Sequence, residues 1–162
     1  MGAPNYAALK AAMATGGAYA GMTDAAVLSA VNDATVTQAV DIPISAVIQA
    51  LALSGLLPTV KGWASAPPAV AGSVTQAAST AAATFGLIVG PPPLFDSLQM
   101  SVPATATAIS GMVSALVSAG LLTAAFADSI TALGTQNVSQ ASLWGFPGGV
   151  FENDLIAARA LS

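Results

Sequence analysis

Apolar side chains recur at intervals of three and four residues along much of the chain, which is the period of one face of a helix. The clearest run lies in the last third, where the apolar face is Ile109, Met112, Val113, Leu116 and Val117. Gly120 is typical of a helix end and Thr123 of a helix N-cap. After Thr123, Phe126, Ile130 and Leu133 form a second apolar face, and Gly134 ends this second helix. The pattern predicts a helical hairpin over residues 110–134.

The same reasoning predicts further helices at residues 4–14, 24–31, 44–53, 69–84 and 152–160, and shorter turns at 56–63, 94–100 and 139–143. Pro4 and Pro43 suit the start of a helix, where a missing N–H costs nothing. Thr23 is expected to cap the helix that follows it. The last helix has acidic residues in its first turn and Arg159 near its end, which matches the helix dipole.

Three segments leave more than one interpretation open. Residues 34–40 alternate weakly, which fits either an extended arm or a short strand. Residues 69–84 are rich in Ala, Ser and Thr and resemble a low-complexity linker, but their apolar spacing favours a helix. Residues 90–93, Gly-Pro-Pro-Pro, are expected to form a stiff extended connector.

Together these elements predict an all-α fold, a small bundle of about six to seven short helices with Pro/Gly-rich extended connectors. An aromatic–glycine turn precedes the short C-terminal helix. We expect an N-terminal helical part at 1–64, an Ala/Ser/Pro-rich helix and extended arm at 65–103, and the hairpin and tail at 104–162. At 162 residues, these parts are expected to pack as one domain.

Charge is scarce in this chain. Only 6% of its residues are charged, against about 25% in ordinary soluble domains, and the net charge is −4. The three basic residues, Lys10, Lys61 and Arg159, are far apart in the sequence, so no basic patch for nucleic acid is expected. There is no Cys or His, which removes disulfides, thiolate ligands and the commonest general base and metal ligand.

The remaining polar residues do not form a recognisable catalytic motif. Glu152 and Asp154 are close in sequence, but their position at a helix start favours stabilisation of the helix N-terminus over a paired-carboxylate site. Asn137 begins a glycosylation sequon, which we interpret as a chance match because residues 1–14 lack the pattern of a signal peptide. We therefore expect no enzymatic activity, cofactor, metal or small-molecule substrate.

A membrane span is the main alternative to a buried hairpin. Residues 104–127 are apolar, and no charge occurs between Asp96 and Asp128. The buried hairpin is favoured because a polar stripe runs opposite the apolar face and a turn interrupts the segment. That stripe is Thr107, Ser110, Ser114 and Ser118.

Large aromatic side chains gather between glycine and proline turns near the C-terminus: Trp144, Phe146 and Phe151. A surface with so little charge resembles one that other chains cover, and aromatic residues often carry much of the binding energy of such an interface. These three residues are our candidate assembly interface. The alternative is a local core beneath the hairpin.

Both ends of the chain carry a pattern of residues in a fixed order. The first part reads Tyr-x-x-Leu-Lys and then Gly-Met-Thr-Asp-x-x-Val-x-x-x-Val-Asn, from Tyr6, Leu9, Lys10, Gly21, Met22, Thr23, Asp24, Val27, Val31 and Asn32. The second part is Ser139, Ala141, Leu143, Gly145, Gly148 and Val150, followed by Asp154, Leu155, Ala158, Arg159, Ala160 and Leu161. The pattern resembles that of small α-helical tailed-bacteriophage proteins associated with the virion tail or neck. Gln140 stands where those proteins usually carry Arg, and residues 69–103 have no counterpart.

The resemblance implies a non-catalytic structural component of the virion, assembled in the host cytoplasm. Its expected partners are copies of itself and other virion proteins at the tail, neck or capsid surface. The pattern consists of caps, turns and core positions, so it transfers no functional residue. The alternative function is that of a small, holin-like phage membrane protein that spans the bilayer through residues 104–127.

Overall fold

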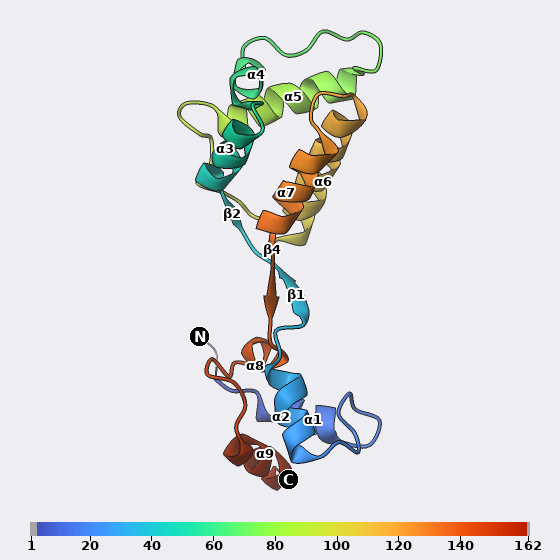
Figure 1. The fold of residues 1–162 in the computed structure, drawn as a ribbon, viewed down its shortest axis with the longest axis vertical. Helices are drawn as coiled ribbons and strands as arrows, with labels where there is room; N and C mark the ends of the chain where they lie inside the picture. The colour runs from blue at the N-terminus through green and yellow to red at the C-terminus, as the bar shows by residue number, and fades with distance from the viewer. Residues whose placement is uncertain (1–2, 162) are drawn as a thin grey trace. The chain divides into compact units, whose positions relative to one another are not determined.

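The structure is a computed structural model that describes residues 3–161, and Figure 1 shows the order of its elements. The helices are α1 Tyr6–Met13, α2 Asp24–Asn32, α3 Ile44–Leu53, α4 Leu57–Gly62, α5 Gln76–Val89, α6 Pro103–Ser118, α7 Ala124–Leu133, α8 Gln140–Leu143 and α9 Glu152–Ala160. The strands are β1 Val36–Ala39, β2 Ile42–Pro43, β3 Ser97–Leu98 and β4 Thr135–Val138.

The expected all-α class is wrong. Over the described residues the chain has nine helices, 54% helical content and two small antiparallel sheets, so it is a mixed α/β protein. One sheet pairs β1 with β4, and the other pairs β2 with β3. Each pair joins segments that are far apart in the sequence. The strands have only two to four residues, which is too short for an alternation of apolar and polar residues to predict them. The ambiguous segment 34–40 contains β1, so its strand interpretation is confirmed.

The chain divides into two compact units, and the first is discontinuous. Unit 1 comprises the described residues of 1–38 and 137–162, and unit 2 comprises residues 39–136. The boundary falls within β1 and β4. This division does not follow the three consecutive segments 1–64, 65–103 and 104–162 that the sequence suggested.

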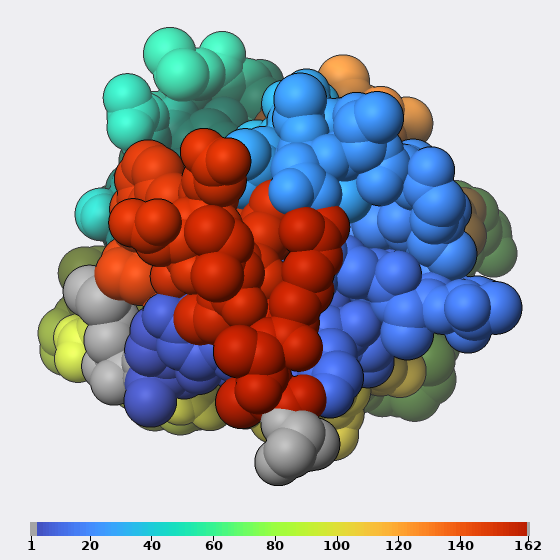
Figure 2. All heavy atoms as spheres, turned by 90° about the horizontal axis from the view of Figure 1, so that it is seen from below, coloured from blue at the N-terminus to red at the C-terminus, as the bar shows by residue number. Residues whose placement is uncertain are grey.

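Unit 1 has its own small core, in which the N-terminal helices α1 and α2 pack with the C-terminal helices α8 and α9. Its buried side chains are Leu9, Val27, Val31, Ala141, Phe146, Val150, Leu155 and Ala158. In Figure 2 the blue N-terminal atoms and the red C-terminal atoms of this unit lie directly against one another. Neither end can form this core without the other.

Unit 2 is built around a larger core that α3, α4, α5, α6 and α7 share. Phe85 and Phe126 meet edge to face in it, with ring centroids 6.3 Å apart. The β2–β3 pair places Ile42 opposite Leu98, and both side chains are buried in the same core. The short sheet therefore fixes the start of α3 against the segment before α6.

Several predicted helices are confirmed, and others are corrected. The hairpin forms as α6 and α7, with Gly120 at a φ of +72° in the turn and Thr123 capping α7. The fourth helix starts later than expected, at Gln76, because Thr75 caps it by accepting the N–H of Ala78. The helical turn expected at 94–100 is wrong, because that segment contains β3.

Residues 104–127 are not one continuous helix. α6 ends at Ser118, and α7 starts at Ala124 after the turn. Within residues 3–161, no helix combines the length and the hydropathy needed to cross a membrane.

Candidate functional site

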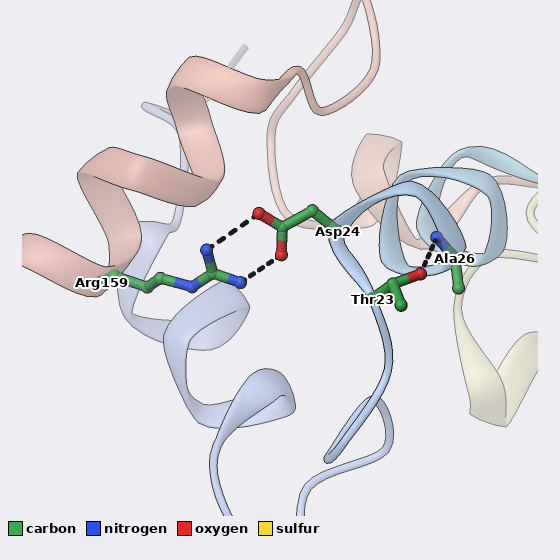
Figure 3. Close-up of polar contacts among 4 residues, drawn as sticks. All are labelled: Thr23, Asp24, Ala26 and Arg159. Carbon is green, nitrogen blue, oxygen red and sulfur yellow. Dashed lines mark hydrogen bonds and ion pairs between the residues drawn. The ribbon is translucent and has the colours of Figure 1, made fainter.

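The residues of the two-ended sequence pattern lie together in unit 1, where they contact one another. Figure 3 shows one such contact, the ion pair between Asp24 at the start of α2 and Arg159 near the end of α9. Arg159 Nη1 donates to Asp24 Oδ2 at 3.0 Å, and Nη2 donates to Oδ1. Thr23 Oγ1 accepts the N–H of Ala26 and so caps the same helix. The hydrogen bonds from Arg159 lower the pKa of the Asp24 carboxyl below its ordinary value.

A second contact joins α1 to the start of α9. Tyr6 Oη donates to Asp154 Oδ1 at 2.9 Å, and Asp154 Oδ2 accepts the backbone N–H of Phe151 at 2.9 Å. The carboxylate thus stabilises the N-terminus of its own helix and ties that helix to α1. The bond to Asp154 raises the pKa of the Tyr6 hydroxyl. Lys10 Nζ adds a further link by donating to the carbonyl oxygen of Leu161.

A third contact joins α2 to the loop before α9. Asn32 Oδ1 accepts the N–H of Val150 at 2.7 Å, and Asn32 Nδ2 donates to the carbonyl oxygen of Val150 at 2.9 Å. Gly149 precedes this pair with a φ of +89°, and a Cβ placed there would lie 2.9 Å from Asn32 Oδ1. Only glycine therefore fits beside the Asn32 side chain without displacing it.

The three candidate interface aromatics do not share one environment. Phe146 is buried and its ring meets Tyr6 edge to face, with centroids 5.2 Å apart. Trp144 is half-buried and meets Tyr19 in a similar way at 6.4 Å. Phe151 is 62% exposed. Phe146 is thus part of the core of unit 1, Trp144 packs against that core, and only Phe151 presents most of its surface to solvent.

Glu152 and Asp154, the two acidic residues considered for catalysis, lie in different structural environments. Asp154 is engaged by Tyr6 and by the backbone of Phe151, whereas Glu152 is exposed in the first turn of α9. Among the described residues, no three acidic side chains gather in a way that could hold a metal ion. The geometry of this pair is that of a helix start.

Unit 2 carries open apolar hollows on its surface, and two of them are bordered by exposed large apolar side chains. One, of about 770 Å³, lies beside α5 and α6 and is bordered by Leu94, Phe95 and Met112. The other, of about 620 Å³, lies between α3 and α7 and is bordered by Leu53 and Leu133. Leu53 is 83% exposed, and Leu94 and Phe95 are more than half exposed. Both hollows therefore present apolar surface of unit 2 to another molecule.

Sequence reasoning missed two of these features. Asn32 belongs to the sequence pattern, but its bonds to the loop before α9 were not predicted; it is the last residue of α2 and directly follows the buried Val31. Leu53 lies at the last position of the helix predicted at 44–53, opposite the buried side chains, and its place beside α7 was not predicted. No local signal identifies either feature, since Val150 lies 118 residues after Asn32 and α7 begins 71 residues after Leu53.

Comparison of the chain with protein-family models, with curated proteins and with solved structures finds no match.

Proposed function

We propose that this protein is a non-catalytic structural component of a tailed-bacteriophage virion, packing in several copies against itself and other virion proteins at the tail, neck or capsid surface. It acts by burying weakly polar faces between subunits. The proposal starts from the resemblance of both chain ends to virion proteins of this kind.

The observation that carries the proposal is that the two ends form one unit. The pattern residues Tyr6, Asp24 and Asn32 contact Asp154, Arg159 and Val150, respectively. The two halves of the pattern lie at opposite ends of the chain but pack together. Each half completes the core of the other, so both halves are needed for the unit to form. This supports treating the pattern as the signature of a shared structural unit.

The surface of unit 2 provides independent support. Among residues 39–136 only Asp41, Lys61, Asp96 and Asp128 are charged, while large apolar side chains are exposed on several elements. A free monomer usually carries more charge for solubility, and obligate interfaces are poor in charge. Such a surface suits a protein that is covered by neighbours in an assembly.

The test is quantitative mass spectrometry of purified phage particles after washes with high salt and non-denaturing detergent. The copy number is measured relative to the major capsid protein of the same particles. An abundant membrane protein of the host is quantified in parallel as the contamination control.

Retention at a constant copy number through both washes is the expected result. Loss in the washes together with the contamination control would overturn the proposal. Recovery in the host membrane fraction, with none in particles, would also overturn it and favour the membrane alternative.

A further inference from the structure

The hollow of about 770 Å³ beside α5 and α6 combines an apolar floor with exposed large side chains at its rim, and we call it the α5/α6 hollow. Its floor is formed by the buried side chains of Ile88, Leu98 and Ile109. At the rim, Leu94 is 60% exposed and Phe95 is 53% exposed. A hollow of this size admits several side chains of another molecule.

Asp96 places a negative charge on the rim. It is exposed, and it is the one charged residue among the described residues that line the α5/α6 hollow. Its backbone carbonyl oxygen accepts the N–H of Ile44 at 2.9 Å, but within residues 3–161 its carboxylate takes part in no hydrogen bond or ion pair. Asp24, by contrast, is paired with Arg159. The charge of Asp96 is therefore available to a cation from outside the chain.

The end of α5 adds to the negative potential of the hollow. Ile88 lies in the last turn of α5 and lines the hollow. The last carbonyl groups of a helix form the negative end of its dipole. Residues 91–93, which follow the C-cap Gly90, are three prolines without an N–H, so they cannot donate hydrogen bonds to those carbonyls. A positive charge is favoured beside such a helix end.

Phe95 provides a third attraction for a positive charge, because the face of an aromatic ring binds Arg and Lys side chains. We propose that the α5/α6 hollow binds a neighbouring protein through a basic side chain flanked by apolar residues, with the cation at Asp96 and the apolar groups on the floor of the hollow. Arginine suits this position best, since its planar group can both bond a carboxylate through two N–H groups and stack on a ring. The inference rests on the proposed assembly role and specifies the surface of the partner.

The charges of the chain indicate that this partner is a different protein. Copies of the chain each carry a net charge of −4 and repel one another. Of the three basic residues, Lys10 and Arg159 are engaged within unit 1. Lys61 follows the buried Val60, and no exposed large apolar side chain adjoins it in the sequence. A second copy therefore matches the hollow poorly, whereas a basic and apolar surface of another protein complements it.

The test is nuclear magnetic resonance of the isotope-labelled full chain, titrated with the peptide N-acetyl-Leu-Arg-Leu-amide. The matched peptide carries citrulline in place of arginine, which has nearly the same shape but no charge. We expect saturable shifts of the amide signals of Asp96, Ser97 and Gln99 with the arginine peptide, and binding of the citrulline peptide that is weaker by about fivefold or more.

Two variants locate the binding site. Asp96→Asn removes the charge and keeps the backbone bond to Ile44, so the fold is expected to stay intact, which the thermal unfolding curve verifies. It should weaken binding of the arginine peptide by about three- to tenfold, and that of the citrulline peptide far less. Asp128→Asn is the matched control, because Asp128 is also exposed but lines the hollow between α6 and α7. It should leave both affinities unchanged.

Three results would each overturn the inference: no saturable shifts with the arginine peptide at its highest soluble concentration, equal binding of the two peptides, or an equal loss of affinity in Asp96→Asn and Asp128→Asn. None of them changes the retention of the protein in particles. The virion proposal is therefore decided separately, by its own copy-number measurement.

Discussion

At the scale of single residues, unit 1 depends on a few side chains that each contact a distant part of the chain. Asn32 is the best example, because both polar atoms of its amide bond the backbone of Val150. Gly149 permits this contact by its positive φ and by its missing Cβ. The geometry predicts that replacing Gly149 by alanine lowers the stability of the protein more than the same replacement at other glycines with a similar positive φ.

Gly149→Ala tests this directly. Its matched control is Gly16→Ala in the same unit, where φ is +85° and a Cβ would meet nothing within 4 Å. Both variants lose stability from the left-handed backbone, but only Gly149→Ala also displaces the Asn32 amide. We expect Gly149→Ala to lower the free energy of unfolding by about 1–3 kcal/mol more than Gly16→Ala in urea denaturation. Equal losses would contradict the role given to Asn32.

The Asp24–Arg159 pair predicts a pH dependence of stability. The folded state lowers the pKa of Asp24, so the pair stabilises the protein above the unfolded pKa of about 4, and this stabilisation is lost as the pH falls through the lower folded value. Asp24→Asn should therefore have a lower Tm than wild type at pH 7, with the gap closing as the pH falls below about 4. Asp33→Asn, which removes the same charge at the other end of α2, is the control.

Thermal unfolding between neutral and acidic pH, at low and high salt, provides the measurement. High salt should also reduce the difference in Tm between wild type and Asp24→Asn, because both side chains of the ion pair are about half exposed and accessible to ions. If the difference in Tm between wild type and Asp24→Asn did not change with pH, the ion pair would not be the cause of that difference.

At the scale of elements, the packing of α4 on α5 depends on one glycine. A Cβ at Gly86 would lie 2.6 Å from the backbone nitrogen of Ala64 and 2.9 Å from the carbonyl oxygen of Val60. Both are main-chain atoms, which cannot rotate away as a side chain does. The two helices approach this closely because residue 86 has no side chain.

Gly86→Ala is expected to destabilise unit 2 by about 1–3 kcal/mol, because the helices must separate to admit the methyl group. Gly111→Ala is its control in α6, where a Cβ would meet nothing within 4 Å. That variant is expected to gain about 0.5–1 kcal/mol, since alanine is the better helix former. Urea denaturation followed by far-ultraviolet circular dichroism measures both, and changes of the same sign would contradict the close contact.

At the scale of the whole molecule, the two cores are separate clusters, and one of the two tryptophans lies in or against each of them. Trp63 is buried in unit 2, and Trp144 is half-buried in unit 1. Fluorescence of a variant that keeps one tryptophan therefore reports the unfolding of one unit. The division of the chain predicts that a core substitution in one unit leaves the other intact.

Leu155→Ala provides the test, because Leu155 is fully buried in unit 1. In a Trp63→Phe background, where Trp144 reports, it should lower the free energy of unfolding by about 2–5 kcal/mol. In a Trp144→Phe background, where Trp63 reports, the urea transition should not move. Leu51→Ala, fully buried in unit 2, should give the opposite pattern. Equal shifts in both backgrounds would mean that the chain unfolds as one cooperative unit.

The sequence by itself determined most of the helices, because the signals that start and end a helix are local. The bounds of α3 and α9 match the predicted 44–53 and 152–160. Thr23 and Thr123 each accept a backbone N–H at the helix start where a cap was predicted. Helical periodicity and capping involve residues three or four positions apart, so they can be identified without knowing the fold.

Only the tertiary structure decided which elements belong together and which side chains are covered. Phe146 and Phe151 belong to the same aromatic–glycine segment, yet one is buried by Tyr6 and the other is exposed. The strands β2 and β3 exist because residues more than 50 positions apart pair, and unit 1 exists because α9 returns to α1. Contacts between distant residues depend on how the whole chain closes its cores, and no local pattern encodes that choice.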